Sequence, residues 1–182
     1  MMSASLITLL LSPFIISTSR QVAKKIDNAL GGDGPLKHSE ESKTLSNHIV
    51  VIGYGVSGRK VVSELLESGH QVLVIDMGPV GANQAKADGA FSILGNAHRR
   101  EILEHAGVRT AKLLVCTLPD HRTSELSIQQ IRAFSSSIPI IARARYSIHA
   151  TSLTRAGADV VVDEECCVGH AISKETLRQI GL

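Results

Sequence analysis

The chain has 182 residues, the size of one ordinary domain with a short additional segment. Its 19 Lys and Arg nearly balance 17 Asp and Glu, so the strong basic excess typical of a nucleic-acid-binding protein is absent. Hydrophobic residues make up 43% of the chain, enough for a folded core, but the 3% of aromatic residues leaves little for a base-stacking surface.

The N-terminal segment is apolar and free of charged side chains up to residue 19, with its most apolar part at Leu6–Ile16. Arg20 and two lysines follow, whereas a signal peptide carries its charges before the apolar run. A membrane-spanning helix needs about 20 apolar residues and gathers positive charge on its cytoplasmic side. We therefore interpret residues 1–26 as the end of a transmembrane helix in a larger membrane protein, with residues 27–182 cytoplasmic. A signal peptide and a buried or disordered extension are the alternatives.

Residues 27–47 show no apolar periodicity. They contain Gly31–Pro35, a run of three glycines, one aspartate and one proline, followed by mixed charges among Ser and Thr. Glycine and proline interrupt regular structure, and mixed charge keeps a segment in water. We therefore predict a linker that ends where a domain begins at His48.

From His48 onward, short runs of β-branched and aliphatic residues alternate with polar stretches. The runs cover residues 49–52, 72–75, 91–94, 113–116, 138–142 and 160–162. They are nearly all apolar, which is typical of strands buried on both faces of a parallel sheet, and the repeat of roughly 20 residues fits a strand followed by a helix. For residues 48–182 we predict a Rossmann-like, doubly wound α/β fold with a parallel six-stranded sheet in the order 3-2-1-4-5-6.

The polar stretches show the spacing of helices. Apolar stripes are formed by Val61, Val62, Leu65 and Leu66, by Ile102, Leu103 and Ala106, and by Leu126, Ile128 and Ile131. A glycine lies between a helical pattern and the next strand at Gly69, Gly89, Gly107 and Gly157. Glycine closes a helix in the left-handed conformation without steric cost, so these positions support the predicted units.

The first strand-to-helix joint reads Gly53-Tyr-Gly55-Val-Ser-Gly58, a G-x-G-x-x-G motif. Its glycines allow a tight turn, a close backbone approach to a pyrophosphate and close packing of the helix, whose amides and dipole attract phosphate. Asp76 ends the second strand, where a carboxylate accepts hydrogen bonds from a ribose diol and repels a 2′-phosphate. We therefore predict binding of NAD(H) or an adenine nucleotide (AMP or ATP) rather than NADP(H). An ordinary glycine-rich turn is the alternative.

Further ligand contacts are predicted at the carboxyl ends of the neighbouring strands. There Arg143 either holds a phosphate or forms an ion pair with the acidic residues 163–165, and the other strand-end residues are either ligand contacts or plain loop residues. The complete predicted cofactor site comprises Gly53, Tyr54, Gly55, Val56, Ser57, Gly58, Asp76, Met77, Asn96, Ala97, Thr117, Leu118 and Arg143.

No reaction centre accompanies this site in the sequence. One helix follows the sixth strand, and the chain has no Tyr-x-x-x-Lys pair. His98 and His105, seven apart on one predicted helical face, lack further ligands at metal-binding spacing, so we expect solvated histidines and no metal. The odd number of cysteines favours a reducing compartment, and the adjacent Cys166 and Cys167 lack a basic neighbour. We therefore expect a sensor without catalytic residues rather than an enzyme.

Several segments together resemble the RCK N-terminal (TrkA-N) domain, which regulates potassium conductance and transport. The resemblance is carried by Val50–Gly58, Val74–Asp76, Gly95–Ala97, Cys116–Asp120, Ile141–Arg143 and Gly157–Val161. The apolar run with its basic flank and linker resembles the last membrane helix of the Kef-type monovalent cation:proton antiporters, which carry this domain at their cytoplasmic C-terminus. The resemblance covers nearly the whole chain, but only the tail of such a transporter.

The resemblance also implies roles for individual residues. It implies that Gly53, Gly55, Gly58 and Asp76 bind the nucleotide, that Asn96 and Thr117 approach the adenosine, and that Arg143 faces the crevice. The chain departs from the family at Asn96, where Asp is usual, and at Val56, where many members carry Arg. Members pair as homodimers through the last helix, where Val168, Ala171, Ile172 and Leu177 would supply apolar contacts.

The function implied by the resemblance is regulatory. A cytoplasmic nucleotide would bind one conformation of the domain dimer better than another and so bias an attached membrane transport core. Two alternatives stay open: a peripheral NAD-binding subunit of a Trk-type potassium uptake system, and a small NAD-dependent oxidoreductase.

Overall fold

The computed structural model describes residues 45–181. The predicted membrane helix at residues 1–26 and most of the predicted linker lie outside the described residues. Within residues 45–181, no helix is both long and apolar enough to cross a membrane. Leu45 and Asn47, at the end of the predicted linker, are part of the domain: Leu45 is buried, and the amide of Asn47 donates to the carbonyl of Thr110 at 2.8 Å.

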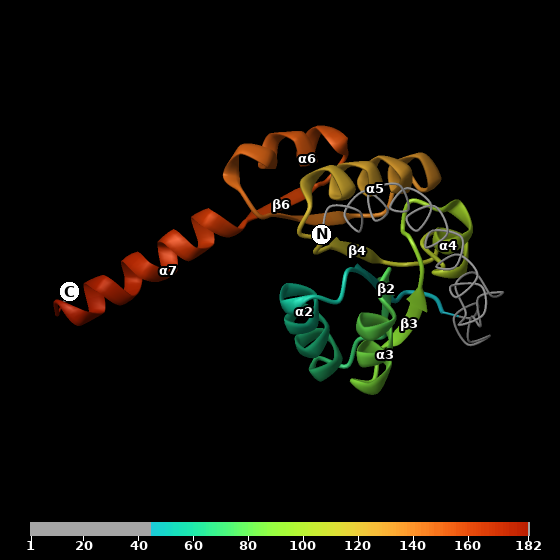
Figure 1. The fold of residues 1–182 in the computed structure, drawn as a ribbon, viewed down its shortest axis with the longest axis horizontal. Helices are drawn as coiled ribbons and strands as arrows, with labels where there is room; N and C mark the ends of the chain where they lie inside the picture. Colours follow the sequence, from blue (N-terminus) through green and yellow to red (C-terminus); the bar gives the residue numbers. More distant parts are fainter. Residues whose placement is uncertain (1–44, 182) are drawn as a thin grey trace, which may run out of the picture. The chain divides into compact units, whose positions relative to one another are not determined.

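Six parallel strands form one sheet in the order β3-β2-β1-β4-β5-β6, as predicted (Figure 1). The strands are β1 (Ile49–Ile52), β2 (Val72–Asp76), β3 (Phe91–Leu94), β4 (Leu113–Cys116), β5 (Ile140–Ala144) and β6 (Val160–Asp163). β1 pairs with β2 on one side and with β4 on the other. The chain direction of the crossovers reverses between β1 and β4, so their carboxyl ends form the switch point at which ligands bind in this fold.

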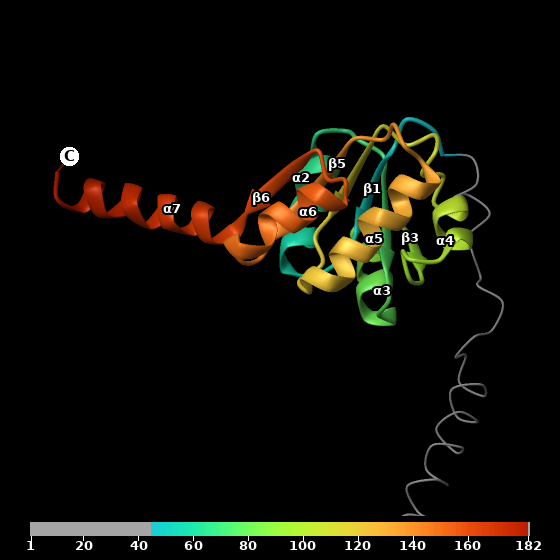
Figure 2. The same cartoon turned by 90° about the horizontal axis from the view of Figure 1, so that it is seen from above.

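Helices cover both faces of the sheet (Figure 2). They are α2 (Val56–Glu67), α3 (Pro79–Ala87), α4 (Arg100–His105), α5 (His121–Phe134), α6 (Ala150–Ala156), which follows the short 3-10 helix η2 (Ser147–His149), and α7 (Glu164–Gln179). Val51 packs with Val62 of α2 in one cluster, whereas Val50 packs with Ile128 of α5 in the other. Because successive residues of β1 and β2 face opposite buried layers, these strands are continuous apolar runs. The prediction of strands buried on both faces is wrong for the edge strands β3 and β6, which are partly exposed.

The helix-closing glycines are confirmed, because all four adopt positive φ: Gly69 at 76°, Gly89 at 95°, Gly107 at 59° and Gly157 at 118°. Two details differ from the prediction. β5 begins at Ile140 instead of residue 138, since Pro139 has no amide to donate to a neighbouring strand. Leu126 is 52% exposed, because a residue two positions before Ile128 lies on the opposite side of the helix.

α7 leads away from the sheet in both views (Figures 1 and 2). None of its residues is buried, although Val168 and Ile172 are large apolar side chains with exposures of 50% and 62%. Asp163 caps the helix by accepting a hydrogen bond from the amide of Cys166 at 3.1 Å. An exposed helix that carries large apolar side chains and is joined to the domain at one end is a candidate contact for a partner.

Candidate functional site

The glycine corner lies where β1 turns into α2. Gly53 has φ 92°, a left-handed conformation that strains any residue with a Cβ. A Cβ at Gly58 would overlap the carbonyl of Gly53 and lie 2.8 Å from the hydroxyl oxygen of Thr117. A Cβ at Gly55 would meet nothing within 4 Å. The fold itself therefore requires Gly53 and Gly58, whereas Gly55 leaves open space that a ligand can approach.

The carboxylate of Asp76 lies beside this corner at the end of β2. One oxygen accepts a hydrogen bond from the backbone amide of Tyr54 at 2.6 Å, and the other accepts from the amide of Gly78 at 2.7 Å. In the first turn of α3, a Cβ at Gly81 would lie 2.8 Å from the carboxyl carbon. The carboxylate is thus fixed between the motif loop and α3, and its remaining lone pairs can accept hydrogen bonds from a ligand.

Thr117 lies beneath the corner. Its residue surface is 7% exposed, and its hydroxyl donates toward the carbonyl oxygens of Ile52 and Gly53, which lie at 3.1 and 3.0 Å. Leu118 contacts the Cβ position of Gly53 from the same strand end. Thr117 therefore ties the end of β4 to the motif, and its hydroxyl faces the protein.

Tyr54 contributes its backbone to the corner and its ring to the core between α2 and α3. The phenol donates to the carboxylate of Asp88 at 2.7 Å, at the carboxyl end of α3. Burial of the phenol, with the hydrogen bond to Asp88, raises the pKa of Tyr54 to about 12. The guanidinium of Arg59 stands 5.8 Å from the ring centre. The motif loop is therefore anchored at two points, Asp76 and Asp88.

The remaining predicted residues of the first half of the site line its rim. Val56 and Met77 are 91% and 63% exposed, and Ser57 is half-buried. Asn96 turns its side chain back on the chain, where its oxygen accepts from the amide of His98 at 2.9 Å, and Ala97 is buried. The rim thus offers the side chains of Val56, Ser57 and Met77 rather than that of Ala97.

His98 does not share a helical face with His105, because α4 begins at Arg100. Its Nε2 lies 3.1 Å from the hydroxyl of Ser127 and 3.3 Å from the carbonyl of Thr123, so the expectation of a solvated side chain is wrong for His98. Among residues 45–181, no group of three or more metal-ligating side chains is brought together.

Arg143 forms an ion pair with Glu164, one of the two alternatives that the sequence left open for this side chain. Its Nε and Nη2 lie 2.7 and 2.5 Å from the same oxygen of Glu164, the first residue of α7. Its Nη1 donates to the carbonyl oxygen of Thr117 at 3.3 Å. The guanidinium therefore sits between the end of β4, next to the glycine corner, and the start of α7.

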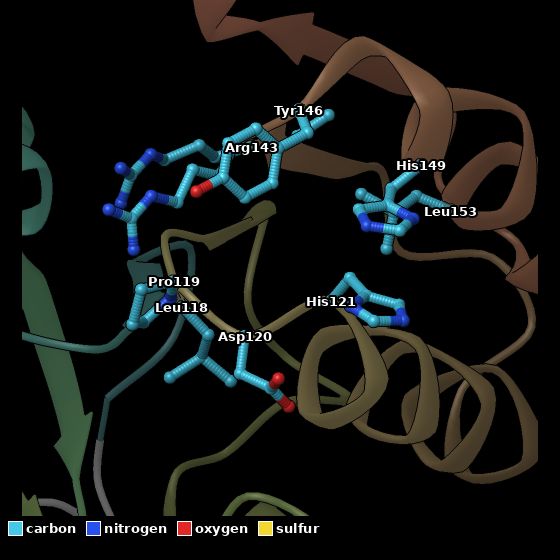
Figure 3. Close-up of a pocket in the computed structure, with 10 residues that line it drawn as sticks. Leu118, Pro119, Asp120, His121, Arg143, Tyr146, His149 and Leu153 are labelled. Atoms are coloured by element: carbon cyan, nitrogen blue, oxygen red, sulfur yellow. The ribbon is translucent and has the colours of Figure 1, made fainter.

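A pocket of about 280 Å³ opens beyond the ends of β4 and β5 (Figure 3). Leu118 and Arg143 line it together with Asp120 and the rings of His121 and His149. The two imidazoles stack with ring centres 3.8 Å apart and planes within 4° of parallel. Neither histidine was predicted from the sequence to be a site residue. Their positions after the fourth and fifth strands were the available signal, but the pairing depends on where η2 places His149.

The TrkA-N domain family model matches residues 49–164, which contain the glycine corner and all six strands of the sheet. The chain belongs to the TrkA-N domain family. It is 32% identical over 118 residues to a protein of Escherichia coli (strain K12) named as the cation/proton antiporter YbaL, covering 65% of this chain and 21% of the relative. It is 25% identical to a glutathione-regulated potassium-efflux system protein of Haemophilus influenzae, over 99% of this chain and 29% of the relative. The chain thus spans less than a third of the length of these curated relatives.

Solved structures show the same fold. The crystal structure of the TrkA-N domain of the Escherichia coli inner membrane protein YbaL matches with a TM-score of 0.68 and 30% identity, covering 72% of this chain and 97% of that one. The Kef C-terminal domain of Shewanella denitrificans in its AMP-bound form matches with a TM-score of 0.66, 24% identity and coverage of 75% and 82%.

Proposed function

We propose that this chain is the cytoplasmic, nucleotide-sensing regulatory part of a membrane potassium or other monovalent cation transporter of the Kef type. The observation that carries the proposal is the carboxylate of Asp76 fixed against the glycine corner, at the switch point of a TrkA-N domain. YbaL is named for cation/proton antiport and the Haemophilus relative for potassium efflux. Residues 1–26 would join this part to the transport core, with residues 27–182 in the cytoplasm.

The proposed ligand is NAD(H) or an adenine nucleotide such as AMP or ATP, bound with its phosphate over Gly55 and its ribose against Asp76. Open space at Gly55 admits a phosphate to the first turn of α2, where amide groups and the helix dipole favour an anion. The acceptor-only carboxylate of Asp76 suits a ribose diol and repels a 2′-phosphate, which disfavours NADP. The AMP-bound Kef domain with the same fold supports a mononucleotide.

The proposed action is regulatory rather than enzymatic. A nucleotide changes a membrane gate only to the extent that it binds one conformation of the domain better than another. The Asp76 carboxylate already accepts from the amides of Tyr54 and Gly78, and the Thr117 hydroxyl is committed to backbone carbonyls, so both groups are placed to hold a ligand rather than to react with it. Reversible binding without turnover is therefore the expected behaviour.

The proposed assembly is a homodimer through α7. Val168 and Ile172 are one turn apart and share a face, beside a groove of about 450 Å³ that Tyr146 also lines. Val160 and Val162 of the edge strand β6 are 52% and 44% exposed nearby in the chain. Leu177, five residues after Ile172, lies on a different side of the helix at about 100° per residue. The contact face is therefore proposed to be that of Val168 and Ile172, without Leu177.

Calorimetric titration of the chain with AMP, ATP, NAD⁺, NADH and NADP⁺ tests the proposal. Wild type is expected to bind AMP or NAD(H) more tightly than NADP⁺. Asp76→Ala removes a charged acceptor and is expected to weaken binding by about tenfold or more. Glu64→Gln, an exposed change on α2, is the control and leaves affinity unchanged. Binding of none of these nucleotides, or equal binding by Asp76→Ala, would sink the site assignment, and turnover of NADH would favour the oxidoreductase.

A further inference from the structure

We propose that Glu164 is a positioning residue for nucleotide binding: its carboxylate competes with the ligand phosphate for Arg143, so that ligand binding loosens the start of α7. The inference rests on the proposed function and deepens it, because it names the contact through which the corner would reach the last helix. Glu164 is half-buried and opens α7 directly after β6.

The first step is the geometry of Arg143. All three nitrogens of its guanidinium have protein acceptors: Nε and Nη2 the carboxylate of Glu164, and Nη1 the carbonyl of Thr117. The hydroxyl of the same threonine donates to Gly53 at 3.0 Å. Arg143 is thus two contacts away from the glycine corner, and a guanidinium is well suited to hold a phosphate with its remaining N–H groups.

The second step is the charge of Glu164. A carboxylate that already occupies two N–H groups of Arg143 reduces the positive charge available to an incoming phosphate and repels it. The ion pair is partly exposed, with side-chain exposures of 21% for Arg143 and 41% for Glu164, so its strength is modest and an anionic ligand can exchange with it. Removing the carboxylate should therefore favour the ligand.

The third step is the attachment of α7. Within the described residues, the hydrogen bonds between α7 and the rest of the domain come from its first turn. Glu164 pairs with Arg143, the carboxylate of Glu165 accepts from the amide of Ser147 at 2.9 Å, and the amide of Cys166 donates to Asp163 at 3.1 Å. The side chains further along α7 are exposed. Loss of one of these three contacts should therefore increase the motion of the first turn, where Cys166 and Cys167 are exposed thiols.

Coupling of this kind is reciprocal. If Glu164 weakens nucleotide binding through Arg143, then the bound nucleotide weakens the hold of Arg143 on Glu164 by the same factor. The ligand site and the helix proposed as the dimer contact are then connected by one ion pair rather than by a change in the whole sheet.

The test compares wild type with Glu164→Gln in the full chain, with AMP as the probe. Glu164→Gln is expected to bind AMP about fivefold more tightly, the factor that corresponds to a partly exposed ion pair. Glu175→Gln removes a negative charge from the far part of α7, where Glu175 pairs with Arg178, and is expected to leave affinity unchanged. Glu164→Asp, which shortens the side chain, serves as the second variant and should give a smaller gain.

A double-mutant cycle shows whether Glu164 acts through Arg143. In an Arg143→Lys background, which loses the planar fork, Glu164→Gln should no longer raise the affinity for AMP. The rate of thiol modification is the second readout: AMP should speed the labelling of Cys166 and Cys167 in wild type but not in Glu164→Gln, while buried Cys116 stays unreactive.

The measured affinities and labelling rates separate a failure of this inference from a failure of the proposed function. Unchanged or weaker AMP binding by Glu164→Gln, or equal gains with and without Arg143, would overturn this inference and leave the proposed function standing. Equal labelling rates of Cys166 and Cys167 with and without AMP would also overturn this inference. If wild type binds no AMP or other adenine nucleotide, the proposed function fails and this inference fails with it.

Discussion

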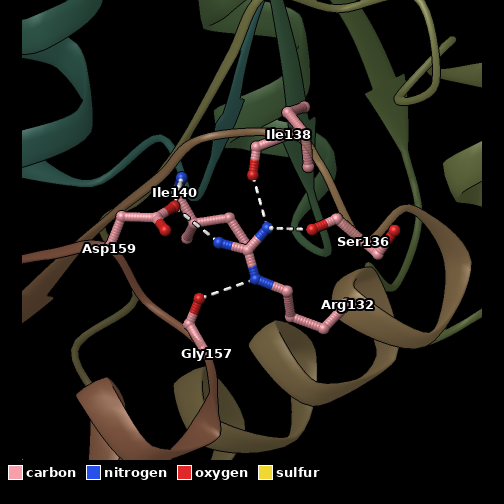
Figure 4. Close-up of polar contacts among 6 residues, drawn as sticks. All are labelled: Arg132, Ser136, Ile138, Ile140, Gly157 and Asp159. Atoms are coloured by element: carbon pink, nitrogen blue, oxygen red, sulfur yellow. Dashed lines mark hydrogen bonds and ion pairs between the residues drawn. The ribbon is translucent and has the colours of Figure 1, made fainter.

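Arg132 of α5 and Asp159, the residue before β6, form an ion pair with an N–O distance of 2.5 Å (Figure 4). Arg132 also donates to the carbonyl oxygens of Gly157 at 2.7 Å and Ile138 at 2.5 Å. The second role of Asp159 is to accept from the amide of Ile140 at 2.7 Å. This pair therefore joins one helix to the entry points of β5 and β6, the strands that carry Arg143 and α7.

Truncation of Arg132 should destabilise the domain. Arg132→Ala leaves carbonyl groups at the half-buried strand entries without their donor, at a cost of about 1–3 kcal/mol in the free energy of unfolding. Arg178→Ala, which breaks an exposed pair on α7, should change that free energy by less than about 0.5 kcal/mol. Urea unfolding measures both, and equal effects would contradict the structural role of Arg132.

The glycine corner predicts opposite outcomes for two alanine substitutions. Gly58→Ala drives a methyl group into the carbonyl of Gly53 and the Thr117 hydroxyl, and should lower the unfolding free energy by about 2 kcal/mol or more. Gly55→Ala meets open space at a φ of −77° and should leave stability nearly unchanged while weakening AMP binding. Thermal melting and calorimetry separate the two effects. Stable Gly58→Ala protein, or full AMP affinity in Gly55→Ala, would contradict this account of the corner.

His48 predicts a pH dependence of stability. It is fully buried, its Nε2 lies 2.9 Å from the carbonyl of Ala106, and its Nδ1 has no partner within the described residues. Burial lowers the pKa of His48 below its usual 6.5. The unfolded chain therefore takes up the proton first, so the contribution of His48 is complete above pH 6.5 and is lost as the pH falls from there toward the lowered pKa.

The corresponding measurement is urea unfolding between pH 7.5 and about pH 5. Wild type should lose stability over this range more steeply than His48→Gln. His70→Gln, which alters an exposed histidine, is the control and should keep the steep profile. Identical slopes for wild type and His48→Gln would show that another group carries the acid sensitivity.

The proposed dimer face predicts a contrast within α7. Val168→Glu or Ile172→Glu places a charge in the proposed contact and should shift the chain to monomer in sedimentation at micromolar concentration. Leu177→Glu, an equally drastic change on another side of the helix, should leave the distribution unchanged. A dimer that survives Ile172→Glu but is lost with Leu177→Glu would place the contact on the other face.

The parts of the fold that could be predicted are those determined by residues close together in the sequence. The apolar runs next to Gly107 and Gly157 could be recognised as strands, because the left-handed turn conformation is a property of the glycine itself, but the run after Gly157 forms a partly exposed edge strand rather than the predicted buried one. Leu126 is exposed, against the prediction, because its angle around α5 differs from those of the buried Ile128 and Ile131. Long-range partners were not predictable in the same way. The sequence alone left two possible partners for Arg143, a ligand phosphate or one of the acidic residues 163–165. The position of α7 in the structure decides that Arg143 pairs with Glu164.

The central claim is that the glycine corner and Asp76 bind an adenine nucleotide. A crystal structure of the chain grown with excess AMP tests it most directly. The account predicts a ribose hydroxyl within hydrogen-bond distance of the Asp76 carboxylate and the phosphate over Gly55, at the start of α2. AMP bound elsewhere, for example between His121 and Arg143, with solvent alone at the corner, would contradict it.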